Sequence, residues 1–265
     1  MRLTAHLKRQ ILLDNLFGVD IDAQAVEVTR FSLSLKALED TRRDELYEER
    51  NLFKQTMLPD LRDNIKCGNS LIGPDYFAGQ MFGEPAELMR VKPFDWQREF
   101  PQVFDGRPLG SSETLKVLPA GGFDAVIGNP PYIRIQTLQE TNPAQVAYLK
   151  QQYRAAGSGN YDIYVVFVEK GLSLLNEHGR LGFILPHKFF NAKYGAALRG
   201  LIAEGQHLAH IVHFSDQQVF DGATTYTALM FLDNAGNEQF EMVKVNDLAG
   251  WRESRPLGSL ETLRV

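Results

Sequence analysis

The residues best suited to chemistry form one tetrapeptide, Asn129-Pro130-Pro131-Tyr132, which follows the apolar run at 123–128. Proline has no backbone N–H to donate, so two consecutive prolines end a strand and stiffen the chain. The Asn129 side chain and the Pro130 main chain each offer a carbonyl acceptor, and Tyr132 offers a flat ring. This set suits an amino group conjugated to an aromatic ring. The two carbonyls would accept hydrogen bonds from its two N–H groups and free its nitrogen lone pair. No general base is then needed before the transfer, which explains an amide at this position instead of a carboxylate.

Polar side chains also follow two earlier apolar segments. Asp20 and Asp22 lie at the end of the segment 15–22, and Asn69 lies in Cys67-Gly68-Asn69-Ser70. A carboxylate can accept both hydroxyls of a ribose, and an acid can equally cap the helix that follows it. We assign ribose to Asp20 and the helix cap to Asp22. The amide of Asn69 could read an adenine edge, although asparagine is also a common turn residue.

Helical and strand periodicities alternate along most of the chain. We predict helices at 2–13, 23–40, 161–179 and 194–204, and strands at 15–22, 64–73, 123–128, 180–186, 207–214 and 225–233. The third of these helices is predicted to start at an Asp162 cap and to stop at Gly179. Residues 74–120 lack a clean period and form a long insertion.

The alternation predicts an α/β fold with a mostly parallel sheet and an antiparallel pair at its edge. In such sheets, ligands bind at the carboxyl ends of the strands. The predicted strands place Asp20, Asn69 and Asn129 at those ends. The strand at 123–128 is predicted to be buried.

The composition is that of an ordinary globular chain of 265 residues, with 44% hydrophobic residues and a net charge of -5. No apolar run is long enough to span a bilayer, and the N-terminus lacks a signal peptide. One cysteine excludes an internal disulfide, so we expect a cytoplasmic protein without membrane contact. On a strand, His207 and His213 would share one face and His210 would lie on the other, so no metal site is predicted.

Several segments together resemble a known family. The motif "GGFDAVIGNPPYIR" resembles the catalytic motif of amino-group DNA methyltransferases, in particular N6-adenine enzymes and the methylase part of type IIG restriction–modification enzymes. The resemblance continues, in order, through "NLFGVDIDAQAVEVTRFSLSLK", "CGNSLIG", "FDWQREFPQVF", "YDIYVVFVEKGLSLLNEHGRLGFILPHKFF" and "FSDQQVFDGATTYTALMFL". It implies a Rossmann-like fold that depends on S-adenosylmethionine.

The resemblance also implies a role for each matching residue. Asp20 would hold the cofactor's ribose and Asn69 its adenine, and Ile21 would also bind the cofactor. Asn129, Pro130 and Tyr132 would hold the target base, flipped out of double-stranded DNA. Phe220 would stack on that base beside Tyr132, although on its own it reads as an ordinary core phenylalanine.

The chain departs from the family pattern at both ends. No glycine-rich cofactor loop precedes Asp20, and no nuclease part is evident. By the resemblance, the chain is a fragment without its first strand and without its target-recognition domain. Residues 1–235 would be the catalytic core, and 236–265 the start of a linker or target-recognition region.

The function expected from the resemblance is adenine-N6 methylation of DNA. Three alternatives stay open. A protein glutamine methyltransferase uses the same tetrapeptide for the same reason. Cytosine N4 chemistry is a nearer variant, which a serine in place of Asn129 would favour. A non-catalytic fragment that binds no cofactor is the third alternative, supported by the missing glycine-rich loop.

Overall fold

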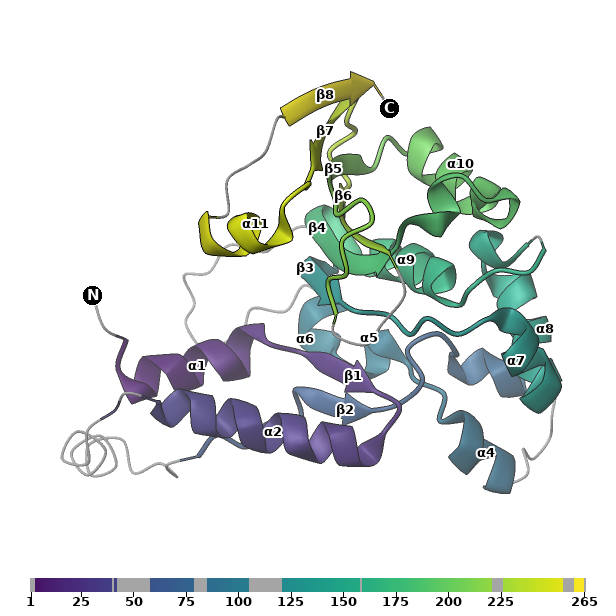
Figure 1. Cartoon of the computed structure of the whole chain (residues 1–265). Coiled ribbons are helices and arrows are strands. Elements are labelled where there is room, and N and C mark those ends of the chain that lie inside the picture. The colour runs from purple at the N-terminus through teal and green to yellow at the C-terminus, as the bar shows by residue number, and fades with distance from the viewer. Residues whose placement is uncertain are drawn as a thin grey trace. The chain divides into compact units, whose positions relative to one another are not determined.

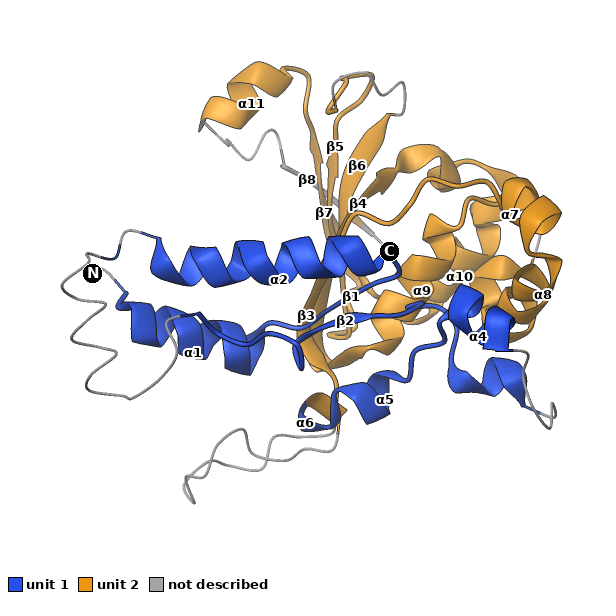
Figure 2. Cartoon of the chain, turned by 90° about the horizontal axis from the view of Figure 1, so that it is seen from below, with its two compact units in different colours: residues 1–102, 107–115 blue, residues 103–106, 116–265 orange. Residues whose placement is uncertain are grey.

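The computed structural model describes residues 3–39, 41, 58–78, 85–104, 121–157, 159–220, 226–254 and 260–264. The chain forms two compact units, coloured separately in Figure 2: residues 1–102 with 107–115, and residues 103–106 with 116–265. The division falls inside the predicted insertion at 74–120, of which residues 79–84 and 105–120 lie outside the described ranges. Within those ranges, no helix is both long and apolar enough to cross a bilayer.

The first unit is a small α/β layer. Its elements are α1 (Ala5–Asn15), β1 (Gly18–Asp20), α2 (Ala23–Leu38), β2 (Ile65–Cys67), the 3-10 turn η1 (Pro74–Phe77), α4 (Pro85–Val91) and α5 (Trp96–Glu99). β1 and β2 pair in parallel, with Asp20 opposite Cys67. The two predicted strands are therefore correct in position, but only three residues of each have strand pairing.

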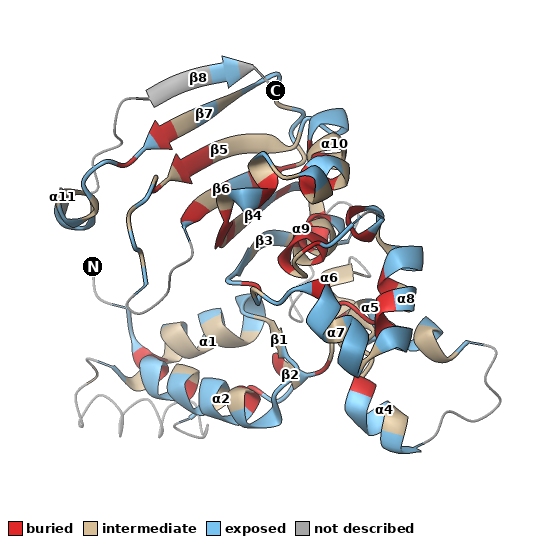
Figure 3. Cartoon of the chain, turned by 45° about the vertical axis from the view of Figure 1, so that its right-hand side comes forward, coloured by how far each residue is buried: buried red, intermediate tan, exposed pale blue. Residues whose placement is uncertain are grey.

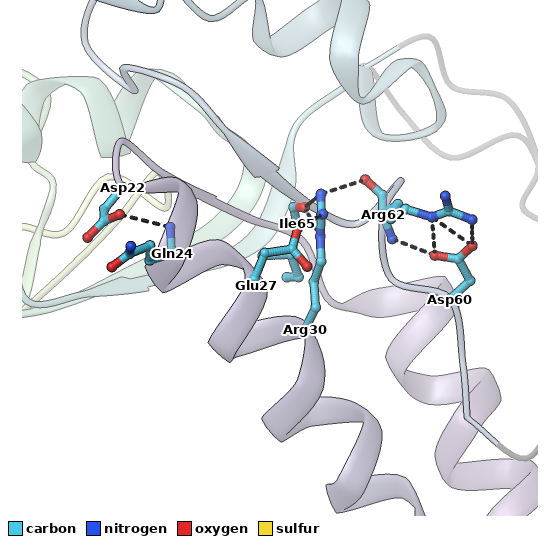
Figure 4. A network of polar contacts seen from close by, with 7 residues as sticks. All are labelled: Asp22, Gln24, Glu27, Arg30, Asp60, Arg62 and Ile65. Atoms are coloured by element: carbon cyan, nitrogen blue, oxygen red, sulfur yellow. Dashed lines mark hydrogen bonds and ion pairs between the residues drawn. The ribbon is translucent and has the colours of Figure 1, made fainter.

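Side-chain hydrogen bonds cap the elements of this unit and join them to one another. Asp22 caps α2 by accepting the Gln24 N–H at 2.8 Å, as predicted. Arg30 of α2 donates from Nε to the Ile65 carbonyl at 2.8 Å, which joins the helix to β2 (Figure 4). The buried amide of Asn64 donates to the Leu13 carbonyl at 2.8 Å. That bond satisfies one of the carbonyls left open where a helix ends.

The second unit contains a six-stranded sheet. The short helix α6 (Pro101–Phe104) spans the boundary in sequence, with its last two residues in this unit. Its helices are α7 (Ile135–Thr141), α8 (Pro143–Gln152), α9 (Tyr164–Ser173), α10 (Ala196–Glu204) and α11 (Leu248–Ser254), with 3-10 turns η2 (Arg154–Ala156), η3 (His187–Phe190) and η4 (Lys193–Gly195). Its strands are β3 (Phe123–Gly128), β4 (Leu175–Pro186), β5 (Leu208–His213), β6 (Thr227–Asp233), β7 (Gln239–Lys244) and β8 (Leu260–Arg264).

The strand order is β3-β4-β6-β5-β7-β8, as can be followed in Figure 1. β3 and β4 are parallel, as are β5 and β7. The predicted antiparallel pair forms between β5 and β6, and β6 lies inside the sheet between β4 and β5. β8 is the antiparallel strand at the edge.

Residues 236–265 are predicted to be the start of a linker or recognition region, and this role stays a prediction. They contribute β7 and β8 to the sheet of the second unit. Val243 and Val245 are buried with Val212 and Phe214 in one apolar cluster, against which Trp251 of α11 packs.

The helix predicted at 161–179 is shorter than its apolar pattern suggests. α9 spans Tyr164–Ser173, its N-cap residue is Ile163, and Asp162 makes no capping bond. Residues 161–163 are occupied instead by backbone pairing with 133–135. Gly179 does not stop the helix, because β4 already begins at Leu175.

The strand predicted at 123–128 has the right bounds but is not buried. Ile127 is 86% exposed and Ala125 is also exposed, so most of β3 is pale blue in Figure 3. β3 pairs with β4 along one edge, and no described strand pairs with its other edge. Side chains of a strand point to the two faces of its sheet, so their burial depends on what packs against those faces, which the sequence of the strand does not show.

α9 lies close against β4, and this approach gives a direct test of the core. A Cβ on Gly171 would fall 2.3 Å from Leu181 Cδ1 and 3.2 Å from Phe183 Cζ. We expect Gly171→Val to lower the free energy of unfolding by about 1–3 kcal/mol through overpacking. Gly200→Ala in α10 is the matched control, since its nearest neighbour, Arg154 Nη2, is 3.5 Å away. The control should raise the free energy of unfolding by about 0.5–1 kcal/mol.

Denaturant unfolding of both variants distinguishes packing from a general intolerance of larger residues in helices. If Gly171→Val unfolds at the wild-type midpoint, the close approach of α9 to β4 is contradicted.

Candidate functional site

The tetrapeptide Asn129–Tyr132 follows β3 directly, at the carboxyl end of that strand. Asn129 is exposed and Pro130 is buried. Neither the Asn129 amide nor the Pro130 carbonyl has a hydrogen bond within the described residues. Both acceptors of the predicted pair are therefore unused within the described residues, although only Asn129 is exposed, and the proline ring fixes φ of the backbone between them.

Tyr132 is half-buried and has defined contacts. Its hydroxyl donates to the Ile184 carbonyl of β4 at 3.4 Å, a long hydrogen bond. Its ring meets the ring of Tyr164 edge-on, with 6.2 Å between the centroids. Burial raises the pKa of the Tyr132 phenol, so it stays neutral at physiological pH. A neutral ring in a fixed place suits stacking on a flat base.

Phe220 lies in the second unit and is 36% exposed, so it is not the core phenylalanine that its type alone suggests. Among the described ring contacts, none joins Phe220 to Tyr132. The expectation that these two rings stack on the same base therefore stays a prediction.

The two acids after β1 have different roles. Asp22 uses one carboxylate oxygen as the α2 cap. Asp20 Oδ1 accepts the Asp22 N–H at 2.8 Å, and within the described chain its Oδ2 has no hydrogen bond. Asp20 is exposed at the carboxyl end of a parallel strand, with a free charged acceptor. This arrangement fits two ribose hydroxyls, whereas Asp22 is committed to the helix.

Asn69 and Ile21 lie at the same ends of the same pair of strands. Asn69 Oδ1 accepts the Leu71 N–H at 3.1 Å, the turn role that its residue type allows, and its NH₂ group has no described partner. The Ile21 side chain is 51% exposed. An open amide and an exposed aliphatic side chain are the groups that an adenine ring can use, one at its edge and one at its face.

The loop that carries Asn69 is fixed by a segment of the predicted insertion. The Asn69 N–H donates to the Lys92 carbonyl at 2.7 Å, and the Phe94 N–H donates to the Ile72 carbonyl at 2.8 Å. Trp96 Nε1 donates to the Ser70 carbonyl at 3.1 Å. The part of the insertion between residues 85 and 104 therefore positions Asn69.

Lys92 is a residue of this region that the sequence analysis missed. Its φ of 50° is unusual for a residue other than glycine. Its ammonium donates to the Ile21 carbonyl at 2.8 Å and lies 3.8 Å from Cys67 Sγ. The lysine thus joins the ends of β1 and β2 to the insertion. No local sequence signal marks this residue, because the proline that follows it favours an extended backbone rather than a positive φ.

Histidines gather at the carboxyl ends of β4 and β5. The rings of His187 and His213 are 4.4 Å apart, and the Ser215 N–H donates to His213 Nδ1 at 2.9 Å. Burial, then His187 and Lys244, lower the pKa of His213, so this imidazole is neutral at neutral pH. Among the described residues, no three histidine, cysteine or acidic side chains lie close enough together to hold a metal ion.

The structure thus describes two sets of residues, each within its own unit. Asp20, Ile21 and Asn69 lie in the first unit, at the ends of β1 and β2. Asn129, Pro130 and Tyr132 lie in the second unit, after β3.

Comparison with known proteins relates this arrangement to restriction–modification enzymes. Residues 14–220 match the family described as Eco57I restriction-modification methylase. The type II restriction enzyme and methyltransferase RM.Eco57I of Escherichia coli is 30% identical over 250 residues, which is 94% of this chain and 22% of that protein. The type II methyltransferase M.XhoI of Xanthomonas vasicola is 39% identical over 115 residues, 42% of this chain and 20% of that protein.

Solved structures show the same fold at low identity. A nuclease-deletion mutant of the type ISP restriction–modification enzyme LlaGI, in complex with a DNA substrate mimic, has a TM-score of 0.59 at 15% identity. That match covers 98% of this chain and 21% of the other. A complex of DrdV with DNA has a TM-score of 0.57 at 14% identity, covering 99% of this chain and 25% of the other.

These likenesses establish the expected Rossmann-like methyltransferase fold. The chain spans about a fifth of the length of the curated relatives named here. The family match extends over more than half of the chain and includes every residue of the two sets. The chain belongs to the Eco57I restriction-modification methylase family.

Proposed function

We propose that this chain is the core of a DNA methyltransferase that transfers a methyl group from S-adenosylmethionine to N6 of adenine. One observation carries the proposal: the Asn129 amide and the Pro130 carbonyl have no hydrogen-bond partner among the described residues, and they follow β3 directly with the Tyr132 ring two residues further on. An exocyclic amino group has two N–H bonds, which match two acceptors.

The chemistry follows from the electronic state of that amino group. Its lone pair is delocalised into the base, which makes the nitrogen a poor nucleophile. Two carbonyl acceptors draw the N–H bonds out of the plane of the base and free the lone pair. Positioning and electrostatic alignment then supply most of the rate enhancement, and no general base is needed before transfer.

A base inside a duplex cannot present its amino group in this way, so we propose that the adenine is flipped out of double-stranded DNA. Tyr132 would stack on one face of the extruded base, and Phe220 on the other. Phe220 is partly exposed and therefore accessible to such a ligand. The DNA complexes among the solved structures of similar fold support DNA as the partner.

The residues after β1 and β2 fit the adenosyl part of the methyl donor. Asp20 would accept the ribose hydroxyls with its open carboxylate oxygen, and Ile21 would cover a face of the adenine. The free NH₂ group of Asn69 would donate to a ring nitrogen. When bound, S-adenosylmethionine supplies an electrophilic methyl group on its sulfonium. The role of the chain is to hold the adenosyl moiety and orient the acceptor nitrogen.

Product analysis tests the proposal directly. The complete protein that carries this chain is incubated with DNA free of methylated bases and with isotope-labelled S-adenosylmethionine, and the DNA is digested to nucleosides for mass spectrometry. We expect N6-methyldeoxyadenosine as the labelled product. Label in N4-methyldeoxycytidine, label in protein glutamine, or no label would each contradict the proposed function.

A further inference from the structure

The segment after the tetrapeptide is held in register by a second segment far along the chain. The Ile163 N–H donates to the Ile133 carbonyl at 2.8 Å, and the Ile135 N–H donates to the Tyr161 carbonyl at 2.9 Å. Between these bonds, residues 134 and 162 form an antiparallel bridge. This pairing displaces the start of α9 to Tyr164 and brings that residue beside Tyr132.

Tyr164 is fully buried, and its ring has contacts on several sides. It meets the Tyr132 ring edge-on, at 79° between the ring planes, and it meets the Phe189 ring at 6.1 Å. Its hydroxyl lies 2.9 Å from the hydroxyl of Tyr194 in η4. A buried ring tied at its hydroxyl end has little freedom to rotate, and edge-on aromatic contacts have a preferred geometry.

Tyr132 itself has weaker restraints. Its hydroxyl bond to Ile184 is long, at 3.4 Å, and the residue directly before it, Pro131, is exposed. The orientation of the Tyr132 ring therefore depends mainly on what packs against it. Burial and the Tyr194 hydroxyl raise the pKa of Tyr164, so this residue acts as a neutral ring over the physiological pH range.

We infer that Tyr164 is a positioning residue: its ring, fixed by Phe189 and Tyr194, sets the plane in which Tyr132 receives the target base. The inference rests on the proposed function. Tyr164 does not touch the substrate in this scheme and acts only through Tyr132. A misplaced stacking ring leaves binding largely intact and lowers the rate at which the acceptor nitrogen reaches a reactive alignment.

The first test follows the Tyr132 ring itself. 3-Fluorotyrosine is placed at position 132 of the complete protein, and its fluorine resonance is compared between variants. We expect Tyr164→Leu to move the resonance most of the way to its position in the unfolded chain, because the edge-on ring is lost. Tyr164→Phe retains the ring and should keep most of the native shift. Tyr194→Phe, which removes only the hydroxyl contact, should give a smaller change in the same direction.

The second test measures transfer kinetics of the same variants without the fluorine label, on DNA free of methylated bases. We expect Tyr164→Leu to lower kcat by on the order of 10²-fold, with KM for DNA and for S-adenosylmethionine changed by less than about threefold. Tyr164→Phe should recover most of that loss.

Phe214→Leu is the matched control for the loss of a buried ring. Phe214 is 2% exposed and packs against Trp251 in a different cluster, without a described contact to Tyr132 or Tyr164. It should leave the fluorine resonance unchanged. If Tyr164→Leu and Phe214→Leu lower kcat equally and neither moves the resonance, Tyr164 is merely structural and the inference is overturned.

Asn129→Ala distinguishes failure of the inference from failure of the proposed function. If it abolishes transfer while Tyr164→Leu leaves kcat intact, the inference fails and the proposed function stands. If Asn129→Ala itself retains transfer, the proposed function fails, and the fluorine shifts alone decide whether Tyr164 orients Tyr132.

Discussion

Replacing Asn129 with alanine is expected to lower kcat for methyl transfer by on the order of 10²- to 10³-fold. The substitution removes one of the two acceptors for the amino group and leaves the Pro130 carbonyl alone. The lost interaction strengthens as the nitrogen becomes tetrahedral, so the loss should appear in kcat more than in KM. The measurement is initial-rate transfer of labelled methyl groups to DNA by the complete protein, at saturating concentrations of both substrates.

A second asparagine in the same unit provides the control. Asn142 lies between α7 and α8, and among the described residues its amide donates only to the neighbouring Thr141 hydroxyl, at 3.1 Å. Asn142→Ala should retain transfer within about threefold, because a local hydrogen bond of this kind contributes only about 1 kcal/mol to stability. A rate for Asn129→Ala within tenfold of the wild type (about 1.4 kcal/mol) would falsify the role of the Asn129 amide.

The cofactor half of the proposal predicts unequal roles for two neighbouring acids. Asp20→Ala is expected to weaken binding of S-adenosylhomocysteine by about 10- to 100-fold, since a hydrogen bond to a charged group contributes about 1.5–3 kcal/mol. Asp20→Asn keeps one carbonyl acceptor and should lie between Asp20→Ala and the wild type. Calorimetric titration of the complete protein measures all three dissociation constants.

Asp22→Ala is the matched control, two residues away and with the same change in charge. It removes the α2 cap and should lower the free energy of unfolding by about 1 kcal/mol, with cofactor affinity within about threefold of the wild type. If Asp22→Ala instead weakens cofactor binding more than Asp20→Ala does, the roles of the two acids are exchanged. Equal loss in both would mean that only the negative charge of this turn matters.

The sequence was sufficient for features that depend on local chemistry. Consecutive prolines end a strand wherever they occur, so Asn129–Tyr132 had to follow β3 directly. An aspartate before an amphipathic run caps it, and Asp22 does so. The alternation of apolar segments likewise indicated the α/β fold and the bounds of α2, β3, β5 and β6 to within a few residues.

Other features depend on which segments meet, and local patterns do not contain that information. The apolar run at 161–179 reads as one long helix, but pairing of 161–163 with 133–135 shortens it and places Tyr164 against Tyr132. The apolar run at 123–128 reads as a buried strand, but β3 has one neighbour in the described sheet and Ile127 faces water. Burial is a property of neighbours rather than of residue type.

The sequence by itself therefore determined the reactive groups, because amide, carbonyl, carboxylate and ring are properties of single residues. It also determined where each stands relative to the end of its own strand. Only the tertiary structure decided what holds these groups: the insertion that positions Asn69 through Lys92 and Phe94, and the buried Tyr164 beside Tyr132. These contacts join segments that are far apart in the sequence, and they form because the segments pack together in the fold. The local sequence around each residue therefore does not predict them.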